Sequence, residues 1–468
     1  MLFNSPTFLV FACAVFSLYA LLRQPRARAL LLLAASYLFY AGWDYRYLSL
    51  LLISTSIDFA AGRALHAEGS ERRRRAWLVA SLATNLGLLG VFKYGNFLLG
   101  NLAGLLGLLG LEAPRLPDEI PIGISFYTFQ TISYTIDCYR RRIRPCDSRL
   151  EFALYVAFFP QLVAGPIVRA HDLLPQLRRL TALRGSHVAE GLQRFTLGLF
   201  KKVVIADNVG LFVDTVFQSP GSYGPITLWC GAYGFALQIY CDFSGYTDMA
   251  LGLARALGVR LPENFAAPYL STSITEFWRR WHMSLSSWLR DYLYIPLGGS
   301  RGGVRQTYRN LFATMLLGGL WHGAAWTFVL WGAFHGALLA FERALGIRAK
   351  THAEPRSAPL VALRGLLTFH LVCLGWVIFR APDFAIARAY LAGLFQGPIG
   401  WDAGTERGLA WAAALLGLAA LQWAARRFDA NELWERLHPS LQGATLAAAV
   451  LAVSLWHVDE VAFIYFQF

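Results

Sequence analysis

Two histidines stand in strongly apolar surroundings and are the side chains whose chemistry most needs an explanation. His282 lies in RRWHMSLSSWLRDY, and His322 lies in GGLWHGAAW, between glycines and tryptophans. A neutral imidazole can take a proton from an attacking hydroxyl group, a role worth roughly 10²- to 10⁴-fold in rate. His322 is therefore a candidate general base. The alternative for His322 is a hydrogen bond between two membrane helices, worth about 0.6–2 kcal/mol.

The other histidines and the short motifs give weaker signals. From its own segment, His282 fits an interfacial histidine on an amphipathic helix, and His335 fits a packing or hydrogen-bonding role. The chain has no HExxH, no GxGxxG leading into a helix, no phosphate-cradling loop and no Ser, His and Asp in a hydrolase order. The motif-based chemistries of soluble enzymes are therefore not expected.

The composition indicates a membrane protein. Of the 468 residues, 56% are hydrophobic and 15% are charged, whereas soluble domains carry roughly 25% charged residues. Apolar runs recur along the whole length, and a helix needs about 20 apolar residues to cross a bilayer. We expect an all-α polytopic bundle, formed by residues 1–468 as a single membrane domain, with about 10–12 crossing helices plus re-entrant and interfacial ones.

The basic residues predict an orientation in the membrane. The net charge of +13 comes from arginines in short clusters between apolar runs, which is typical of cytoplasmic loops and not of a nucleic-acid-binding face. They place both termini on the outer face, with the N-terminal run kept as the first span because it lacks a signal-peptide pattern. The six cysteines show no metal-like spacing, and we interpret them as packing residues.

The apolar runs place the expected helices along the chain. They cover residues 8–22, 29–43, 47–64, 77–91, 228–257, 310–326, 327–344, 363–379, 409–425 and 441–456. Residues 121–142 mix polar side chains into an apolar frame and should line an aqueous or protein-filled interior. Residues 154–169 are broken by prolines and fit a re-entrant element or a kinked span. Asp242, deep in an apolar run, should be paired or face a cavity.

Several segments together resemble a known family. The segment FWRRWHMSLSSWLRDYLYIPLGGSRGG, followed by GGLWHGAAWTFVLWGAFHG, is similar to the membrane-bound O-acyltransferases, in the bacterial branch with alginate O-acetylation and teichoic acid D-alanylation. PIGISFYTFQTISYTIDCYR, FFPQLVAGPIVR, GLFKKVVIAD, YCDFSGYTDMA, GWVIFRAP and FIYFQF follow the same pattern in the same order. The resemblance covers nearly the whole chain.

The resemblance implies roles for three residues. His322 matches the invariant histidine of the family, and His282 matches the second active-site position, so both should meet in a channel through the protein. Tyr465 matches a tyrosine that carries the acyl group, within a periplasmic C-terminal aromatic motif at residues 463–468. An aromatic anchor at the membrane interface is the alternative for this motif. The residues that bind coenzyme A stay unassigned.

The expected function is transfer of an acetyl group from cytoplasmic acetyl-CoA, without a metal, across a bacterial inner membrane. Tyr465 would pass the group to a periplasmic partner with a serine nucleophile, which would acetylate an exported or cell-wall polysaccharide such as alginate. One alternative keeps the enzyme class but has peptidoglycan or a small exported molecule as the acceptor. Another is a transporter or exporter subunit in which the histidines relay protons.

Overall fold

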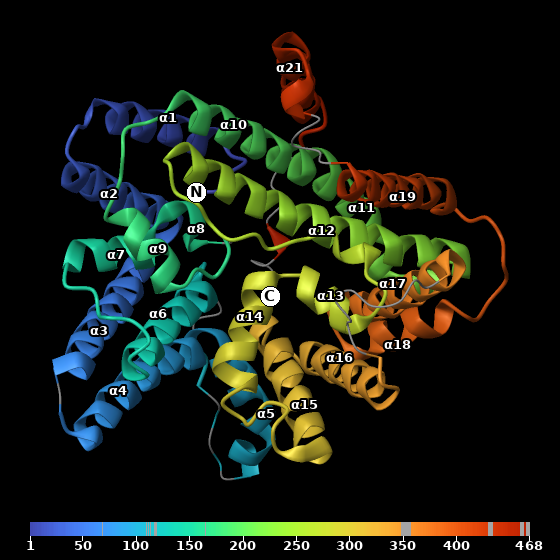
Figure 1. Ribbon diagram of the computed structural model, residues 1–468. Coiled ribbons are helices and arrows are strands. Elements are labelled where there is room, and N and C mark those ends of the chain that lie inside the picture. Colours follow the sequence, from blue (N-terminus) through green and yellow to red (C-terminus); the bar gives the residue numbers. More distant parts are fainter. Residues whose placement is uncertain are drawn as a thin grey trace. The chain divides into compact units, whose positions relative to one another are not determined.

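The computed structural model describes residues 1–67, 69–108, 110, 112, 114–116, 119–163, 165–347, 357–428, 434–458 and 463–464, and every regular element among them is a helix (Figure 1). The chain divides into two compact units. The first contains Met1–Phe195 and Tyr246–Pro262, and the second contains Thr196–Gly245 and Glu263–Phe468. The long helix α12 (Pro225–Ala256) contributes to both units.

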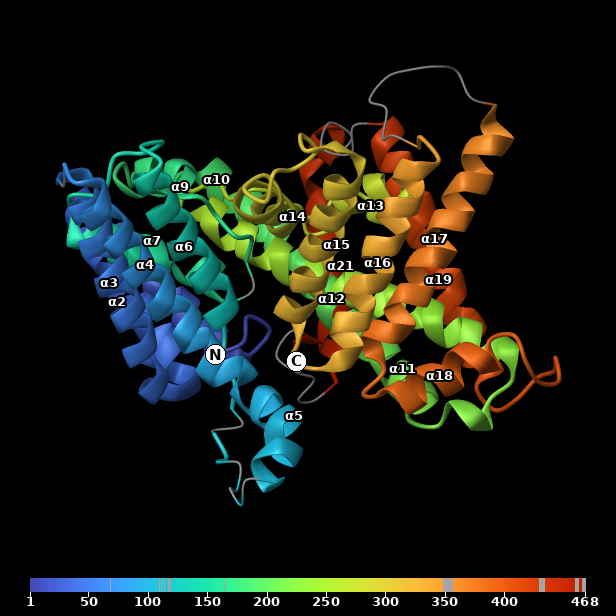
Figure 2. The ribbon, with the colours of Figure 1, turned by 90° about the horizontal axis from the view of Figure 1, so that it is seen from below.

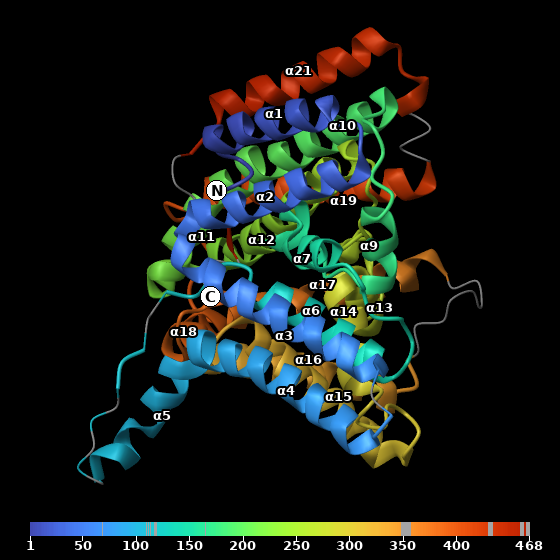
Figure 3. The same cartoon turned by 90° about the vertical axis from the view of Figure 1, so that its left-hand side faces the viewer.

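The first unit is built mainly from the N-terminal helices. They are α1 (Pro6–Leu21), α2 (Pro25–Asp44), η1 (Tyr45–Tyr47), α3 (Leu48–Ala67), α4 (Glu71–Leu89), η2 (Gly90–Tyr94), α5 (Gly95–Leu108), α6 (Ile124–Tyr139), α7 (Arg149–Ala157), α8 (Phe159–Leu162), α9 (Ala170–Leu177) and most of α10 (Gly185–Phe200). Both α1 and α2 begin with proline, whose fixed φ suits the first turn of a helix. Helices α3, α4 and α6 pack against one another (Figure 3).

The polar segment predicted to line an interior forms α6, and its polar side chains are buried within the protein. Asp58 of α3 accepts hydrogen bonds from Ser81 and Asn85 of α4 and from Thr135 of α6. A buried carboxylate needs such donors because its desolvation is costly. The prediction of a protein-filled surrounding for this segment is confirmed.

The second unit holds the histidines singled out above. Its elements are η3 (Lys201–Ala206), α11 (Asp207–Gln218), η4 (Pro220–Ser222), the first part of α12, η5 (Pro268–Leu270), α13 (Ile274–Arg280), α14 (Met283–Leu289), η6 (Arg290–Tyr294), α15 (Gly303–His322), α16 (Trp326–Ala344), α17 (Ala358–Arg380), α18 (Phe384–Gly393), α19 (Thr405–Arg427) and α21 (Pro439–Leu455). Helices α15 and α16 form a hairpin, with α17 packed against α16 (Figure 2).

The expected membrane character is supported by four helical stretches that are long and apolar enough to cross a bilayer. They are Pro25–Ala67, Glu71–Leu105, Ala358–Arg380 and Thr405–Arg427, and three shorter apolar helices accompany them among the described residues. Each long stretch coincides with one or two of the apolar runs expected from the sequence. The total number of crossings and the orientation of the termini stay predictions.

Two local predictions are wrong. Cys13 is exposed, unlike the other five cysteines, so packing in the protein interior does not explain it. His282 does not lie on an amphipathic helix but between α13 and α14. Residues 154–169, expected to form a re-entrant element or a kinked span, contain the end of α7 and the short α8, which carries Pro160 in its first turn. All of α8 is buried, so this broken backbone lies inside the protein.

Candidate active site

His322 is the last residue of α15, at the point where the chain turns into α16. The turn is tight because glycines let the two helices approach. A Cβ atom on Gly319 would lie 2.2 Å from the carbonyl oxygen of Phe328, and one on Gly332 would lie 2.4 Å from that of Met315. Side chains at either position would therefore push the helices apart. The glycines around His322 indicate this close approach, which fixes the imidazole at the turn between α15 and α16.

Aromatic rings surround the imidazole of His322, which is 4% exposed. The ring centroid of His322 lies 5.0 Å from that of Trp321, 5.1 Å from that of Trp331 and 5.4 Å from that of Phe379, all in edge-on arrangements. These rings come from α15, α16 and α17 respectively. Three helices therefore define the position of His322.

His282 has an unusual backbone conformation. It lies in the left-handed region, with φ 42° and ψ 56°, a region that costs an L-residue about 1–2 kcal/mol. Asn264 holds the chain in this turn: its carbonyl oxygen accepts the N–H of Met283, and its side-chain oxygen accepts the N–H and the hydroxyl of Ser284. Strain of this kind is found where the surrounding structure fixes a residue for a purpose.

Glu342 fixes the short helix that precedes His282. Its carboxylate accepts the backbone N–H of Ile274 at 2.5 Å, and the N–H and hydroxyl of Thr275 at 2.9 Å each. These are the first N–H groups of α13, which have no partner within the helix. Because Glu342 lies near the end of α16, it ties α13 to the helix that begins just after His322.

The two histidines share one aromatic cluster. The ring centroid of His282 lies 6.0 Å from that of Trp321 and 4.7 Å from that of Phe243 on α12, and Trp321 is also in contact with His322. His282 is 0% exposed. Burial lowers its pKa to about 3, so its imidazole is neutral at physiological pH. The structure thus brings together the two residues paired by the family resemblance.

His335 also belongs to this cluster. Its ring stacks on Phe277 and lies 4.9 Å from Trp331, and the indole N–H of Trp278 donates to its Nδ1 at 3.4 Å. A Cβ atom on Gly375 of α17 would lie 2.9 Å from its Nε2. These contacts agree with the packing and hydrogen-bonding role expected for His335. Trp331 separates it from His322.

Tyr465, the predicted acyl carrier, lies outside the described residues. The two residues before it, Phe463 and Ile464, are 0% and 3% exposed. Phe463 contacts Phe243, the ring that also contacts His282. An anchor at the membrane interface, the alternative weighed for the aromatic motif, therefore does not describe Phe463.

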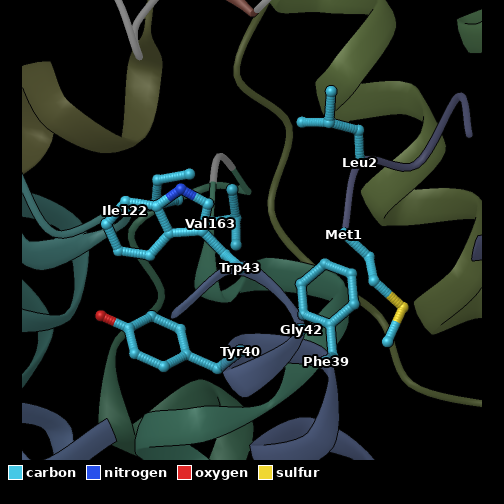
Figure 4. Close-up of a pocket in the computed structure, with 8 residues that line it drawn as sticks. All are labelled: Met1, Leu2, Phe39, Tyr40, Gly42, Trp43, Ile122 and Val163. Carbon is cyan, nitrogen blue, oxygen red and sulfur yellow. The ribbon is translucent and has the colours of Figure 1, made fainter. Parts of the chain in front are cut away.

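Sequence reasoning missed Asn264 and Glu342. Asn264 follows Glu263 in the stretch between α12 and η5, and Glu342 precedes Arg343 within the expected span 327–344. A signal was available for Glu342, because a carboxylate inside a predicted membrane helix should have a partner. A separate cavity of about 250 Å³ lies in the first unit between Met1, Leu2, Phe39, Tyr40, Gly42, Trp43, Ile122 and Val163 (Figure 4). None of the predicted site residues lines it.

Comparisons with known proteins identify the family of this chain. Residues 145–358 match the family model described as "MBOAT, membrane-bound O-acyltransferase family", and this range contains both histidines. The chain is 47% identical to the probable alginate O-acetylase of Pseudomonas aeruginosa over 85% of this chain and 75% of the relative. It is 46% identical to the probable alginate O-acetylase of Azotobacter vinelandii over 85% of this chain and 78% of the relative.

A third relative carries a different name. The chain is 38% identical to the peptidoglycan O-acetyltransferase of Helicobacter pylori, over 84% of this chain and 80% of the relative. With these matches, the chain belongs to the membrane-bound O-acyltransferase family. It is accordingly a multi-pass membrane protein and an acyltransferase.

Proposed function

We propose that this protein takes an acetyl group from cytoplasmic acetyl-CoA and delivers it across the bacterial inner membrane for O-acetylation of an exported polysaccharide. The observation that supports this most strongly is the shared contact of His282 and His322 with Trp321, within one buried cluster. A site for a water-sensitive thioester benefits from such enclosure, because water would otherwise compete as the acceptor. The acetyl group is favoured because the relatives compared above are named O-acetylases or O-acetyltransferases.

In the proposed step the phenol of Tyr465 attacks the thioester carbonyl of acetyl-CoA. A C–O bond forms and the C–S bond breaks. The phenolic proton passes to His322, which acts as general base and then returns a proton to the coenzyme A thiolate as it leaves. The products are coenzyme A and an aryl ester on the tail. No metal takes part in this proposal.

His282 has a different proposed role. Its low pKa makes it a poor base but a neutral hydrogen-bond donor. We assign to it the orientation of the thioester and the stabilisation of charge on the carbonyl oxygen, a type of interaction worth several kcal/mol in enzymes. The strained backbone of His282, held by Asn264, fits a residue that must stay in one place.

The acetylated tail would then meet a periplasmic partner with a serine nucleophile. That partner would take the acetyl group from the aryl ester and place it on the sugar. An alginate-like acceptor is supported by the relatives at 46–47% identity. Peptidoglycan is the second candidate, supported by the relative at 38% identity. Both acceptors are consistent with one acetyl-delivery mechanism in this chain.

The acetate content of the cell's exported polysaccharide and of its peptidoglycan tests the function. Strains carrying His322→Ala or Tyr465→Phe should lose acetate from the same one of these polymers while making the polymer itself in normal amounts. The polymer that loses acetate identifies the acceptor. Wild-type acetate in both polymers, with both variants inserted in the membrane at normal levels, would contradict the proposal.

A further inference from the structure

A buried charge cluster lies in the second unit, apart from the groups that act in the proposed mechanism. The side chain of Lys202 in η3 is 1% exposed, and its Nζ lies 2.6 Å from Oδ1 of Asp207 and 2.7 Å from Oδ1 of Asp242. One cation thus serves two carboxylates. Buried ion pairs contribute little net stability because desolvation offsets their attraction, so a purpose other than stability should be sought for this cluster.

Local backbone geometry brings the three charges together. Lys202 lies in a π-helical turn, a feature often found at functional sites, and Asn208 donates to the carbonyl oxygens of Val203 and Val204 in that turn. Helix α12 comes close at Gly245, where a Cβ atom would lie 2.7 Å from the carbonyl oxygen of Gly198. Gly245 is one helical turn after Asp242, so this approach places Asp242 against Lys202.

The second oxygen of Asp242 binds the C-terminal segment of the chain, defined as Phe463 and Ile464. Its Oδ2 accepts the backbone N–H of Ile464 at 2.8 Å, across a separation of 222 residues. The ring of Phe463 lies 6.0 Å from that of Phe243, the residue after Asp242, and Phe243 lies 4.7 Å from His282. One backbone hydrogen bond and one ring contact therefore hold the segment next to the active-site histidine.

A second contact fixes the chain shortly before this point. The Nδ2 group of Asn208, which follows the π-helical turn, donates to the carbonyl oxygen of Trp456 at 2.9 Å. The end of α21 and the C-terminal segment are thus both bound by residues next to the same charge cluster. Two anchors eight residues apart along the chain argue for a built docking site and against a chance contact.

Lys202 explains why Asp242 can act as an acceptor while buried. Burial by itself would lower the pKa of Lys202, but the two carboxylates raise it above its usual value, so the lysine keeps its charge. The ammonium group of Lys202 pairs with Asp242, and a carboxylate in such a pair can accept charge-assisted hydrogen bonds from N–H groups. Asp207 contacts the same ammonium group of Lys202.

We infer that Asp242, held by Lys202, is the docking residue for the chain's own C-terminal segment and keeps Phe463 and Ile464 beside His282. The ligand class is an aromatic peptide segment that donates a main-chain N–H to a buried carboxylate. In this role Asp242 is a positioning residue. The docking of Phe463 and Ile464 is inferred from their contacts and does not depend on the proposed function. Its effect on acetyl transfer rests on the proposed function, because Tyr465 directly follows Ile464.

The test measures how easily the docked segment becomes accessible. In a full-length Cys13→Ser chain, the remaining native cysteines are buried, so Ile464→Cys supplies a reporter for a maleimide reagent. Asp242→Leu should raise the labelling rate of this reporter about tenfold or more, since it removes a hydrogen bond to a charged acceptor. Asp242→Asn keeps an oxygen acceptor but loses the charge, so its labelling rate should lie between those of the parent and Asp242→Leu.

Two controls separate docking from general loosening. Asp248, also on α12, is paired with Arg194, and Asp248→Leu should leave the labelling rate unchanged. A second comparison leaves every buried charge in place. It uses Phe463→Cys as the reporter and adds Ile464→Pro, which removes the N–H donor itself. Labelling should rise in this chain too. All rates are measured on the monodisperse fraction from gel filtration.

Parental labelling rates in both Asp242→Leu and Ile464→Pro would overturn the docking inference. If only the proline variant folds, its rate decides alone. A raised rate with unchanged acetyl transfer would confirm docking and contradict the tyrosine relay instead. The two proposals can therefore fail separately.

Discussion

The imidazole of His282 lies against the indole of Trp321, with ring centroids 6.0 Å apart, although the two residues are far apart in sequence. Trp321 immediately precedes His322 and contacts it as well. One indole therefore links the short segment between α13 and α14 to the α15–α16 hairpin. The consequences of this arrangement for activity and stability can be measured.

Removal of the His322 imidazole should reduce acyl transfer while leaving the protein folded. His322→Gln keeps a polar side chain at the end of α15 but removes the base, so turnover of acetyl-CoA should fall by roughly 10²- to 10⁴-fold. Release of the coenzyme A thiol in purified membranes measures this. His370→Gln is a matched control, since His370 lies in the same unit and bonds to Tyr233 away from the cluster. It should retain turnover within a few fold.

Because the backbone of His282 is left-handed, different substitutions at this position should change the stability of the protein by different amounts. Asn adopts this conformation readily, whereas a β-branched residue does so at high cost. His282→Asn should therefore remain about as stable as the parent, and His282→Val should be less stable by about 1–2 kcal/mol. Thermal unfolding in detergent compares the two variants. Equal melting temperatures would show that the backbone at His282 is not strained.

The buried, neutral His282 should make stability depend on pH in a defined window. Its pKa is about 3 in the folded protein against 6.5 for an exposed histidine, so between these values the unfolded chain binds a proton that the folded chain does not. Stability from this group is present above pH 6.5 and is lost as the pH falls, by about 1.4 kcal/mol per pH unit.

Melting temperatures at neutral pH and near pH 5 test this dependence. His282→Asn lacks the titrating group, so its melting temperature should fall less on acidification than that of the parent. Other carboxylates and histidines affect both chains alike and cancel in the comparison. The same loss in both chains would show that His282 does not titrate in this way.

Glu342 should position His282 through α13. Glu342→Ala leaves the N–H groups of Ile274 and Thr275 without their acceptor, at a cost of about 1–3 kcal/mol. Turnover should fall, and Glu342→Gln, which keeps one acceptor oxygen, should recover part of it. Glu406 is exposed at the start of α19, and Glu406→Ala should change neither stability nor turnover. Full activity in Glu342→Ala would show that Glu342 does not position His282 through α13.

The sequence predicts the helical membrane class and the polar interior well, because apolar run length and buried polarity are local properties. Helix α6 and the glycines around His322 illustrate this. The position of His282 could not be predicted from its own segment, since its pattern fits a surface helix equally well. Its burial depends on Asn264, Glu342 and Phe243, which tertiary folding brings to it.

The docked C-terminal segment shows a second limit of local patterns. The aromatic motif fits a membrane-interface anchor and a bound tail equally, because both bury aromatic rings. The deciding contact is the hydrogen bond from Ile464 to Asp242. The sequence predicts that Asp242 is paired or faces a cavity, and the pairing is confirmed by Lys202. No sequence spacing indicates that its other oxygen binds the tail.

In the proposed mechanism the chain itself carries the acetyl group on Tyr465. Purified protein should be incubated with radiolabelled acetyl-CoA in the absence of any acceptor, and its peptides then analysed by mass spectrometry. One acetyl group is expected on the C-terminal peptide at Tyr465, absent from both His322→Gln and Tyr465→Phe. The relay through Tyr465 would be contradicted by two results together. The parent would carry no acetyl group on its C-terminal peptide, and Tyr465→Phe would release coenzyme A and acetylate polysaccharide at parental rates.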